Sequence, residues 1–244
     1  MTSPATSDHE RRRPDGPHPG ILAIVSLAFT IAAVVASVLL GAGQSIPSPL
    51  GSTASVAQFY LSHPDAAAVA GFLVFGSSIP LGIFAATVYA RMLRLGIRVP
   101  GPGIGYFGGI AAAVMVGIAG VITWVTGQAI SGQSTATIHT LAYLSYALGG
   151  VGFVTGVGLL IAGIAVPAFI LALVPRWLAW VGLAVALICE VSFVSMLVPA
   201  LTFTLPIGRF AGLAWLIAIG FVLPRTRHEG RERRESAAAA SRTS

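Results

Sequence analysis

The chain has 244 residues, of which 55% are hydrophobic and only 9% charged, and its mean hydropathy is +0.87. Soluble domains usually carry roughly 25% charged residues, so a water-soluble fold of this size could not bury so much apolar surface. All 14 basic residues are arginines gathered at the chain ends and in short connections, which excludes a folded basic face of the kind that binds nucleic acid.

Apolar runs of membrane-spanning length recur along the chain and predict an all-α, integral membrane six-helix transmembrane bundle. A polar tail over residues 1–20 and an arginine-rich tail over 224–244 are expected to be disordered in the cytoplasm. The spans predicted between them, within 21–223, are 21–40, 66–90, 104–126, 138–166, 178–198 and 206–223.

The connection after the first span contains a short amphipathic segment. Residues 53–61 predict a helix whose Val56, Phe59 and Tyr60 rest on the membrane surface. Ser62 is expected to cap the second span, with Pro64 in its first turn.

Prolines interrupt two of the predicted spans. Pro80 lies in the middle of the second and predicts a kink, because it leaves the Gly76 carbonyl without an amide partner. The apolar run over 136–174 would be nearly 60 Å long as a helix, about twice the hydrocarbon thickness. We therefore expect a tilted fourth span that Pro167 breaks or kinks. The residues 100–103, Pro-Gly-Pro-Gly, predict a stiff turn before the third span.

Small residues mark helix surfaces that can approach closely in lipid. Gly105 and Gly109 form a GxxxG pair in the third span, and Gly149, Gly150, Gly152 and Gly156 mark the fourth.

The distribution of arginine predicts the orientation. With the amino terminus inside and six spans, thirteen of the 14 arginines lie on the inner side and Arg209 alone on the outer side. Both termini are expected in the cytoplasm of a bacterium, where the inner arginines attract anionic lipid without needing a dedicated partner.

Glu190 is the one acidic residue inside a predicted span. An ionisable group there is costly, so it should face the bundle interior and be protonated or paired. Arg209 opens the next span and is the natural partner, unless it extends to the outer headgroups instead. Glu190 could couple transport to protons, or it could only join helices through a polar contact.

Ser77 and Ser78 lie beside the Pro80 kink at a depth similar to that of Glu190. Interrupted helices at matching positions of two halves indicate a transporter site, although proline kinks are also common in membrane helices. The candidate polar intramembrane site therefore comprises Glu190, Arg209, Ser77 and Ser78.

Common enzyme signatures and metal-ligand clusters are not found in the sequence. His63 and His139 fall on the outer side without the accompanying residues of a metal site, and Cys189 has no partner for a disulfide. We expect no catalytic activity, no metal and no cofactor.

Two stretches, 56–96 and 175–223, resemble a family of bacterial multi-span membrane proteins that is grouped only as a domain of unknown function. The second opens with Pro175-Arg176-Trp177-Leu178, the family's inner turn. The resemblance implies an integral membrane protein and no established activity.

Two functional hypotheses follow. The first is a non-enzymatic membrane protein with a structural, sensory or partner-binding role. The second is a small proton-coupled transporter that uses Glu190, and a water-accessible cavity reaching Glu190 would favour it.

Overall fold

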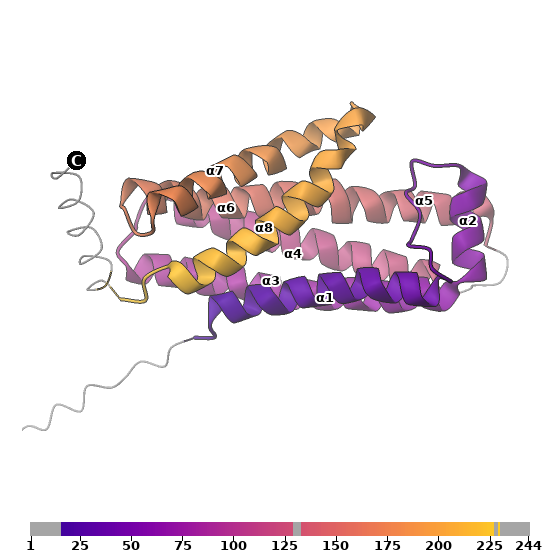
Figure 1. Cartoon of the computed structure of the whole chain (residues 1–244), viewed down its shortest axis with the longest axis horizontal. Helices are drawn as coiled ribbons and strands as arrows, with labels where there is room; N and C mark the ends of the chain where they lie inside the picture. Colours follow the sequence, from indigo (N-terminus) through magenta and orange to yellow (C-terminus); the bar gives the residue numbers. More distant parts are fainter. Residues whose placement is uncertain (1–15, 129–132, 227–228, 230–244) are drawn as a thin grey trace, which may run out of the picture.

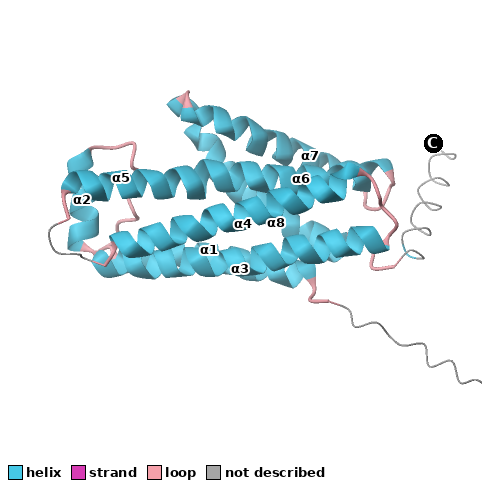
Figure 2. Cartoon of the chain, turned by 180° about the vertical axis from the view of Figure 1, so that it is seen from behind, coloured by secondary structure: helices cyan, strands magenta, loops and turns pink. Residues whose placement is uncertain are grey.

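The computed structural model describes residues 16–128, 133–226 and 229, so most of both predicted tails lies outside it. Within these residues the chain forms helices joined by turns (Figures 1 and 2). Their bounds are α1 Pro19–Leu40, α2 Thr53–Ser62, α3 Pro64–Arg94, α4 Pro100–Thr126, α5 Thr135–Tyr146, α6 Phe153–Ile170, α7 Arg176–Val191 and α8 Thr204–Val222. A π-helix, η1 (Ala147–Gly152), joins α5 to α6, and two 3-10 helices, η2 (Ser192–Met196) and η3 (Pro199–Phe203), join α7 to α8.

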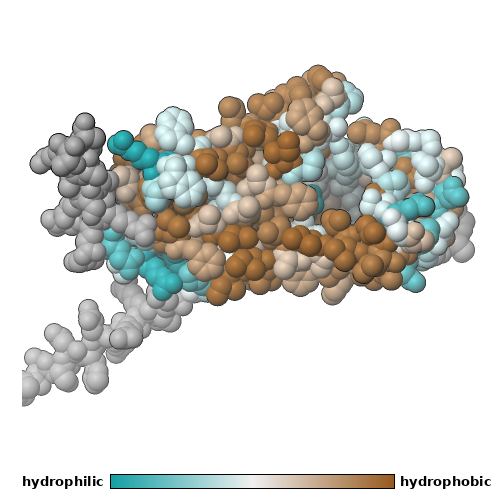
Figure 3. Space-filling model, viewed as in Figure 1, coloured by the Kyte–Doolittle hydropathy of each residue, from teal (hydrophilic) through white to brown (hydrophobic). Residues whose placement is uncertain are grey.

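Six helical stretches of the described chain are long and apolar enough to cross a membrane. Large hydrophobic side chains point outward along them, and Leu39, Phe107 and Leu187 are 76%, 66% and 65% exposed. Figure 3 shows this apolar surface along the middle of the molecule, with more polar residues toward its two ends. Because water would not tolerate such a surface, the chain is a multi-pass integral membrane protein, as predicted.

The spans pack in chain order, each against the next, and α8 closes the ring on α1. Both described chain ends lie at the same end of the bundle (Figure 1). We call it the arginine end, because Arg91, Arg94, Arg176 and Arg225 lie at helix termini there, and we call the other the α2 end. Trp177 and Trp180 are exposed at the arginine end, as suits a membrane–water boundary.

Glycines bring α4 close to both α3 and α6, which confirms the predicted small-residue contacts. A Cβ on Gly105 would lie 3.2 Å from the Leu160 carbonyl oxygen of α6, and one on Gly109 would lie 2.5 Å from the Ala85 Cβ of α3. A Cβ on Gly156 would lie 2.7 Å from the Ala112 amide nitrogen. Backbones therefore touch at these crossings, which favours dispersion contacts in lipid.

The long fourth span differs from the prediction. It is a continuous helical stretch of 36 residues, Thr135–Ile170, or about 54 Å at the usual rise. Its length is accommodated because α5 extends beyond α1 at the α2 end and packs against α2 there (Figure 1).

The placement of α2 corrects another prediction. Val56, Phe59 and Tyr60 do not rest on a membrane surface but are 0%, 5% and 4% exposed. They pack with Ile138 and Ala142 of α5 in a small core of their own. Burial also raises the pKa of Tyr60 to about 12, because the phenolate would lose its hydration.

Several helix boundaries also differ from expectation. Ser62 ends α2 and does not cap α3, whose N-cap is His63. Pro100 begins α4 and is not part of a turn, because the first helical position needs no amide hydrogen.

The two interior prolines do not end their helices. The α3 helix continues across Pro80, and α6 continues across Pro167 to Ile170. The chain then turns at Ala172, whose φ is 49°, and the Leu173 amide donates to the Ala168 carbonyl at 2.9 Å.

Candidate functional site

Arg209 lies in α8 and turns toward the interior of the bundle. Its guanidinium donates to the backbone carbonyl of Gly149 in the π-helix, and Cζ lies 4.8 Å from the centre of the Phe153 ring. Among the described residues, the Gly149 carbonyl is the hydrogen-bond partner of the guanidinium and the Phe153 ring is its cation–π partner. No carboxylate of the described residues forms an ion pair with Arg209. The interaction with the ring replaces part of the hydration that the cation loses.

The exposed part of Arg209 faces a cavity of about 320 Å³, which we call the Arg209 cavity. It lies in the half of the bundle nearer the α2 end, where the space-filling surface is hollowed beside α8 (Figure 3). Its walls come from α1, the loop after α1, α3, α4, α5, η1 and α8 and are mainly apolar. They comprise Val34, Ile46, Ala70, Val74, Ala119, Thr123, Ser145, Tyr146, Gly149, Gly150, Leu205, Pro206, Arg209 and Phe210.

Two hydroxyl groups add polarity to the same cavity. Thr123 Oγ1 and Ser145 Oγ lie 2.7 Å apart, and each is within hydrogen-bond distance of the Ala119 carbonyl, at 2.9 and 3.0 Å. The hydroxyl pair joins α4 to α5 and leaves acceptor lone pairs for a bound polar group.

Glu190 lies near the end of α7 and is half-buried against α6. A Cβ on Gly158 would lie 2.7 Å from Glu190 Oε1, so the carboxylate fits the space that this glycine leaves. Oε1 is buried and has no hydrogen-bond partner among the described residues. Glu190 does not line the Arg209 cavity.

Two further buried hydroxyl oxygens in this region have no partner within the described chain, Thr155 Oγ1 on α6 and Ser195 Oγ on η2. Thr155 and Gly158 are three residues apart and therefore share a face of α6. The elements that carry Thr155, Glu190 and Ser195 pack against one another. Such unsatisfied oxygens are costly in a membrane interior and favour a bound water or ion, and the carboxyl of Glu190 can instead bind a proton.

Ser77 has a structural role. Its hydroxyl donates to the Val74 carbonyl of its own helix at 2.7 Å, and its carbonyl accepts from Ser26 Oγ of α1 at 2.9 Å. It therefore helps to join α1 to α3.

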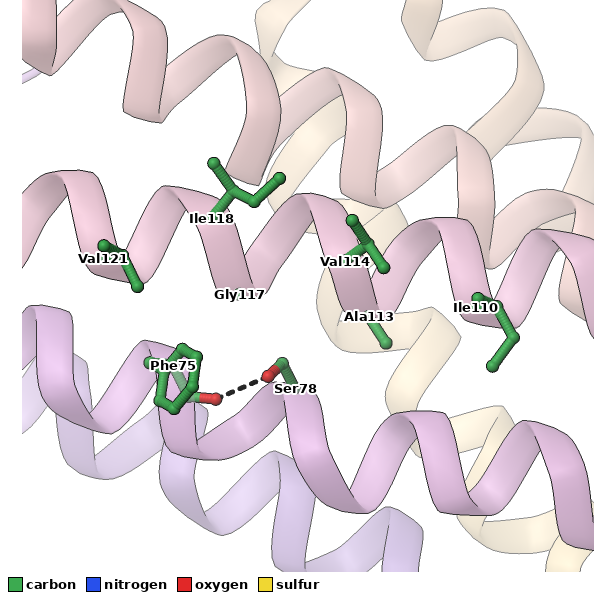
Figure 4. Close-up of a pocket in the computed structure, with 8 residues that line it drawn as sticks. All are labelled: Phe75, Ser78, Ile110, Ala113, Val114, Gly117, Ile118 and Val121. Atoms are coloured by element: carbon green, nitrogen blue, oxygen red, sulfur yellow. Dashed lines mark hydrogen bonds between the residues drawn. The ribbon is translucent and has the colours of Figure 1, made fainter.

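Ser78 faces an apolar groove of about 420 Å³ between α3 and α4 (Figure 4). Its hydroxyl donates to the Phe75 carbonyl at 2.6 Å and so is satisfied within its own helix. Gly117 lies opposite, where a Cβ would be 3.1 Å from Ser78 Oγ. The one hydroxyl among its described lining residues is therefore already bonded, and the other lining residues are apolar.

The four predicted site residues are thus placed in separate environments. Arg209 faces the cavity and η1, Glu190 packs against Gly158 of α6, and the two serines bond within α3. Glu190 and Arg209 lie on neighbouring helices, but over the described residues they form no ion pair with each other.

Sequence reasoning missed Thr123, Ser145 and the π-helix, which together with Arg209 form the polar part of the cavity. The adjacent Gly149 and Gly150 could have indicated an irregular backbone as well as a packing surface, because paired glycines weaken a helix.

His139 has a structural contact. Its Nε2 lies 2.9 Å from the Pro49 carbonyl, which joins α5 to the loop after α1.

Comparison of the chain with protein-family models, with curated proteins and with solved structures found no match.

Proposed function

We propose that this chain is a non-enzymatic membrane protein that binds a partner molecule inside the bilayer, at the Arg209 cavity. The observation that carries the proposal is a guanidinium at the edge of an apolar cavity with no carboxylate partner among the described residues. A cation in such surroundings is stabilised by an anion that enters the cavity.

The chemistry of the walls suggests the kind of partner. A volume of about 320 Å³ is near the lower end of small-molecule sites, which usually span about 300–1,000 Å³. Apolar walls accept a hydrocarbon body, and Arg209 can bind a carboxylate head through two parallel hydrogen bonds. An amphiphile with one carboxylate therefore fits best.

The orientation of the site follows from the positive-inside bias. We place both termini, and hence the arginine end, in the cytoplasm of a bacterial cell. The Arg209 cavity would then lie in the outer half of the cytoplasmic membrane and receive its partner from that leaflet.

The test uses the full chain in lipid nanodiscs, with dodecanoate and neutral dodecanol as probes of equal length. We expect dodecanoate to raise the apparent melting temperature by several degrees at saturation and dodecanol to raise it much less, because only the acid meets the guanidinium. Arg209→Gln should remove the difference between the probes.

Arg176→Gln provides the matched control, because it removes a guanidinium that does not line the Arg209 cavity and should keep the difference between the probes. Equal effects of both probes on the native chain would contradict the proposal, since they would report only partition into the bilayer.

A proton-coupled transporter that uses Glu190 is the second candidate. The unsatisfied carboxyl oxygen of Glu190 favours it, because a carboxyl group without a fixed partner can take up and release a proton. The hydroxyl oxygens of Thr155 and Ser195, also without partners among the described residues, can hold a water or a cation beside it. The separation of Glu190 from the Arg209 cavity favours the first proposal instead.

Reconstituted liposomes distinguish the two candidates. If the chain couples transport to protons, a pH gradient should drive proton flux across liposomes that contain the native chain. Glu190→Gln should abolish that proton flux. If Glu190 only joins helices, the substitution should change the melting temperature and leave dodecanoate binding intact.

A further inference from the structure

A second cavity, of about 200 Å³, lies at the opposite end of the molecule from α2. It is formed where the residues before α1, the last turns of α3 and the residues after α8 meet. Its lining residues are Gly16, His18, Thr87, Arg91, Arg94 and Arg225. It is separate from the Arg209 cavity, and its role does not depend on the function proposed there.

The lining is strongly basic. Three of the six described residues that line it are arginines, and none of these six is acidic. Arg91 is only 6% exposed, and its Nη1 lies 3.4 Å from the Leu223 carbonyl, which connects α3 to the end of α8. Guanidinium groups present a planar fork of donors that matches the oxygens of a phosphate group.

The backbone around this cavity is held in place by a close helix contact. A Cβ on Gly220 of α8 would lie 2.5 Å from the Gly20 amide nitrogen of α1, so the two helix ends touch. The His18 ring packs against Phe221, with ring centres 4.7 Å apart. The three walls are therefore fixed relative to one another before any ligand arrives, which lowers the entropic cost of binding.

His18 adds a polar group without adding positive charge. Burial, and the charges of Arg225 and Arg91, lower the pKa of its imidazole below the usual 6.5. A neutral imidazole can donate one hydrogen bond and accept another. The cavity thus offers hydrogen-bond donors from the residues before α1, the end of α3 and the residues after α8. These lie at the end of the bundle, where the helices leave the membrane.

We infer that this cavity, formed by His18, Arg91, Arg94 and Arg225, is a binding site for a phosphate group. The group can be carried by the headgroup of an anionic phospholipid or by a free phosphate. A diffuse attraction of arginines to anionic lipid would involve every arginine at this end equally. A built site involves only those that line the cavity.

The experiment compares arginines of the same end. The full chain in detergent micelles is titrated with phosphatidic acid, with phosphatidylcholine as the neutral lipid, and binding is followed by native mass spectrometry and thermal shift. We expect Arg94→Gln and Arg225→Gln to weaken phosphatidic acid binding at least tenfold. Arg98→Gln and Arg176→Gln lie outside the lining and should leave the affinity within twofold.

A parallel titration with inorganic phosphate identifies the source of the group. Binding of phosphatidic acid alone assigns a lipid site, and equal binding of inorganic phosphate assigns a soluble ligand. Either result supports the site if the two lining variants lose it. Equal losses in all four variants, or no saturable binding of either probe to the native chain, would overturn the inference.

Discussion

At the scale of single residues, Glu190 and Arg209 show what a depth argument leaves out. The rise per residue gives the height of a side chain in the membrane, and by height the two residues could meet. Contact also depends on the direction in which each helix turns its side chain, which the sequence did not determine. Glu190 faces Gly158, whereas Arg209 faces Gly149 and Phe153. All three partner residues lie in the helical stretch Thr135–Ile170, but at different heights along it.

His18 provides a prediction at this scale. Its pKa is lowered in the folded chain, so between that value and about 6.5 the unfolded chain binds more protons. Stability is therefore unaffected by this group above about pH 6.5 and falls as the pH decreases below it. Between pH 7.5 and 5.5, the melting temperature of the native chain should decrease more than that of His18→Gln. Parallel decreases in the two proteins would show that His18 is not responsible.

At the scale of helices, much was predictable because one-dimensional patterns suffice. Apolar runs gave the six spans, and spaced glycines gave the close crossings of α4. The position of α2 was not predictable, because its apolar residues suit a membrane surface and a protein surface equally well. Because α5 extends beyond α1, its side chains cover the apolar residues of α2.

The crossing of α4 and α6 makes a second prediction. A Cβ on Gly163 would lie 2.5 Å from the Gly101 carbonyl oxygen, whereas one on Gly103 would have no atom within 4 Å. Gly163→Ala should therefore destabilise the chain by roughly 1–3 kcal/mol through overpacking. Gly103→Ala should be neutral or stabilise by up to about 1 kcal/mol, because alanine favours the helix. The melting temperatures of the two variants are compared in detergent. Similar effects of Gly163→Ala and Gly103→Ala would argue against a backbone contact at Gly163.

At the scale of the whole molecule, the orientation in the membrane can be measured directly. Ser45 and Arg98 are exposed at opposite ends of the bundle, and the single native Cys189 is buried. In intact cells, an impermeant maleimide should label Ser45→Cys but not Arg98→Cys, and lysis should expose the second thiol. The native chain supplies the background. Labelling of Arg98→Cys alone in intact cells would reverse the proposed orientation.

The contacts of the helices divide the bundle into a tight part and a looser one. In α4, Gly105 and Gly108 meet backbone atoms of α6, and Gly120 meets backbone atoms of α3. By contrast, the nearest neighbours of Gly182, Gly208 and Gly212 in α7 and α8 are side chains, which can change rotamer. Among the described glycines of α8, only Gly220 lies so close to the backbone of another helix that a Cβ would be under 3.0 Å from it, at the Gly20 amide nitrogen of α1. A ligand too wide for the Arg209 cavity would therefore gain room if the α7–α8 hairpin bent outward at its η2–η3 end, while α3, α4 and α6 keep their spacing.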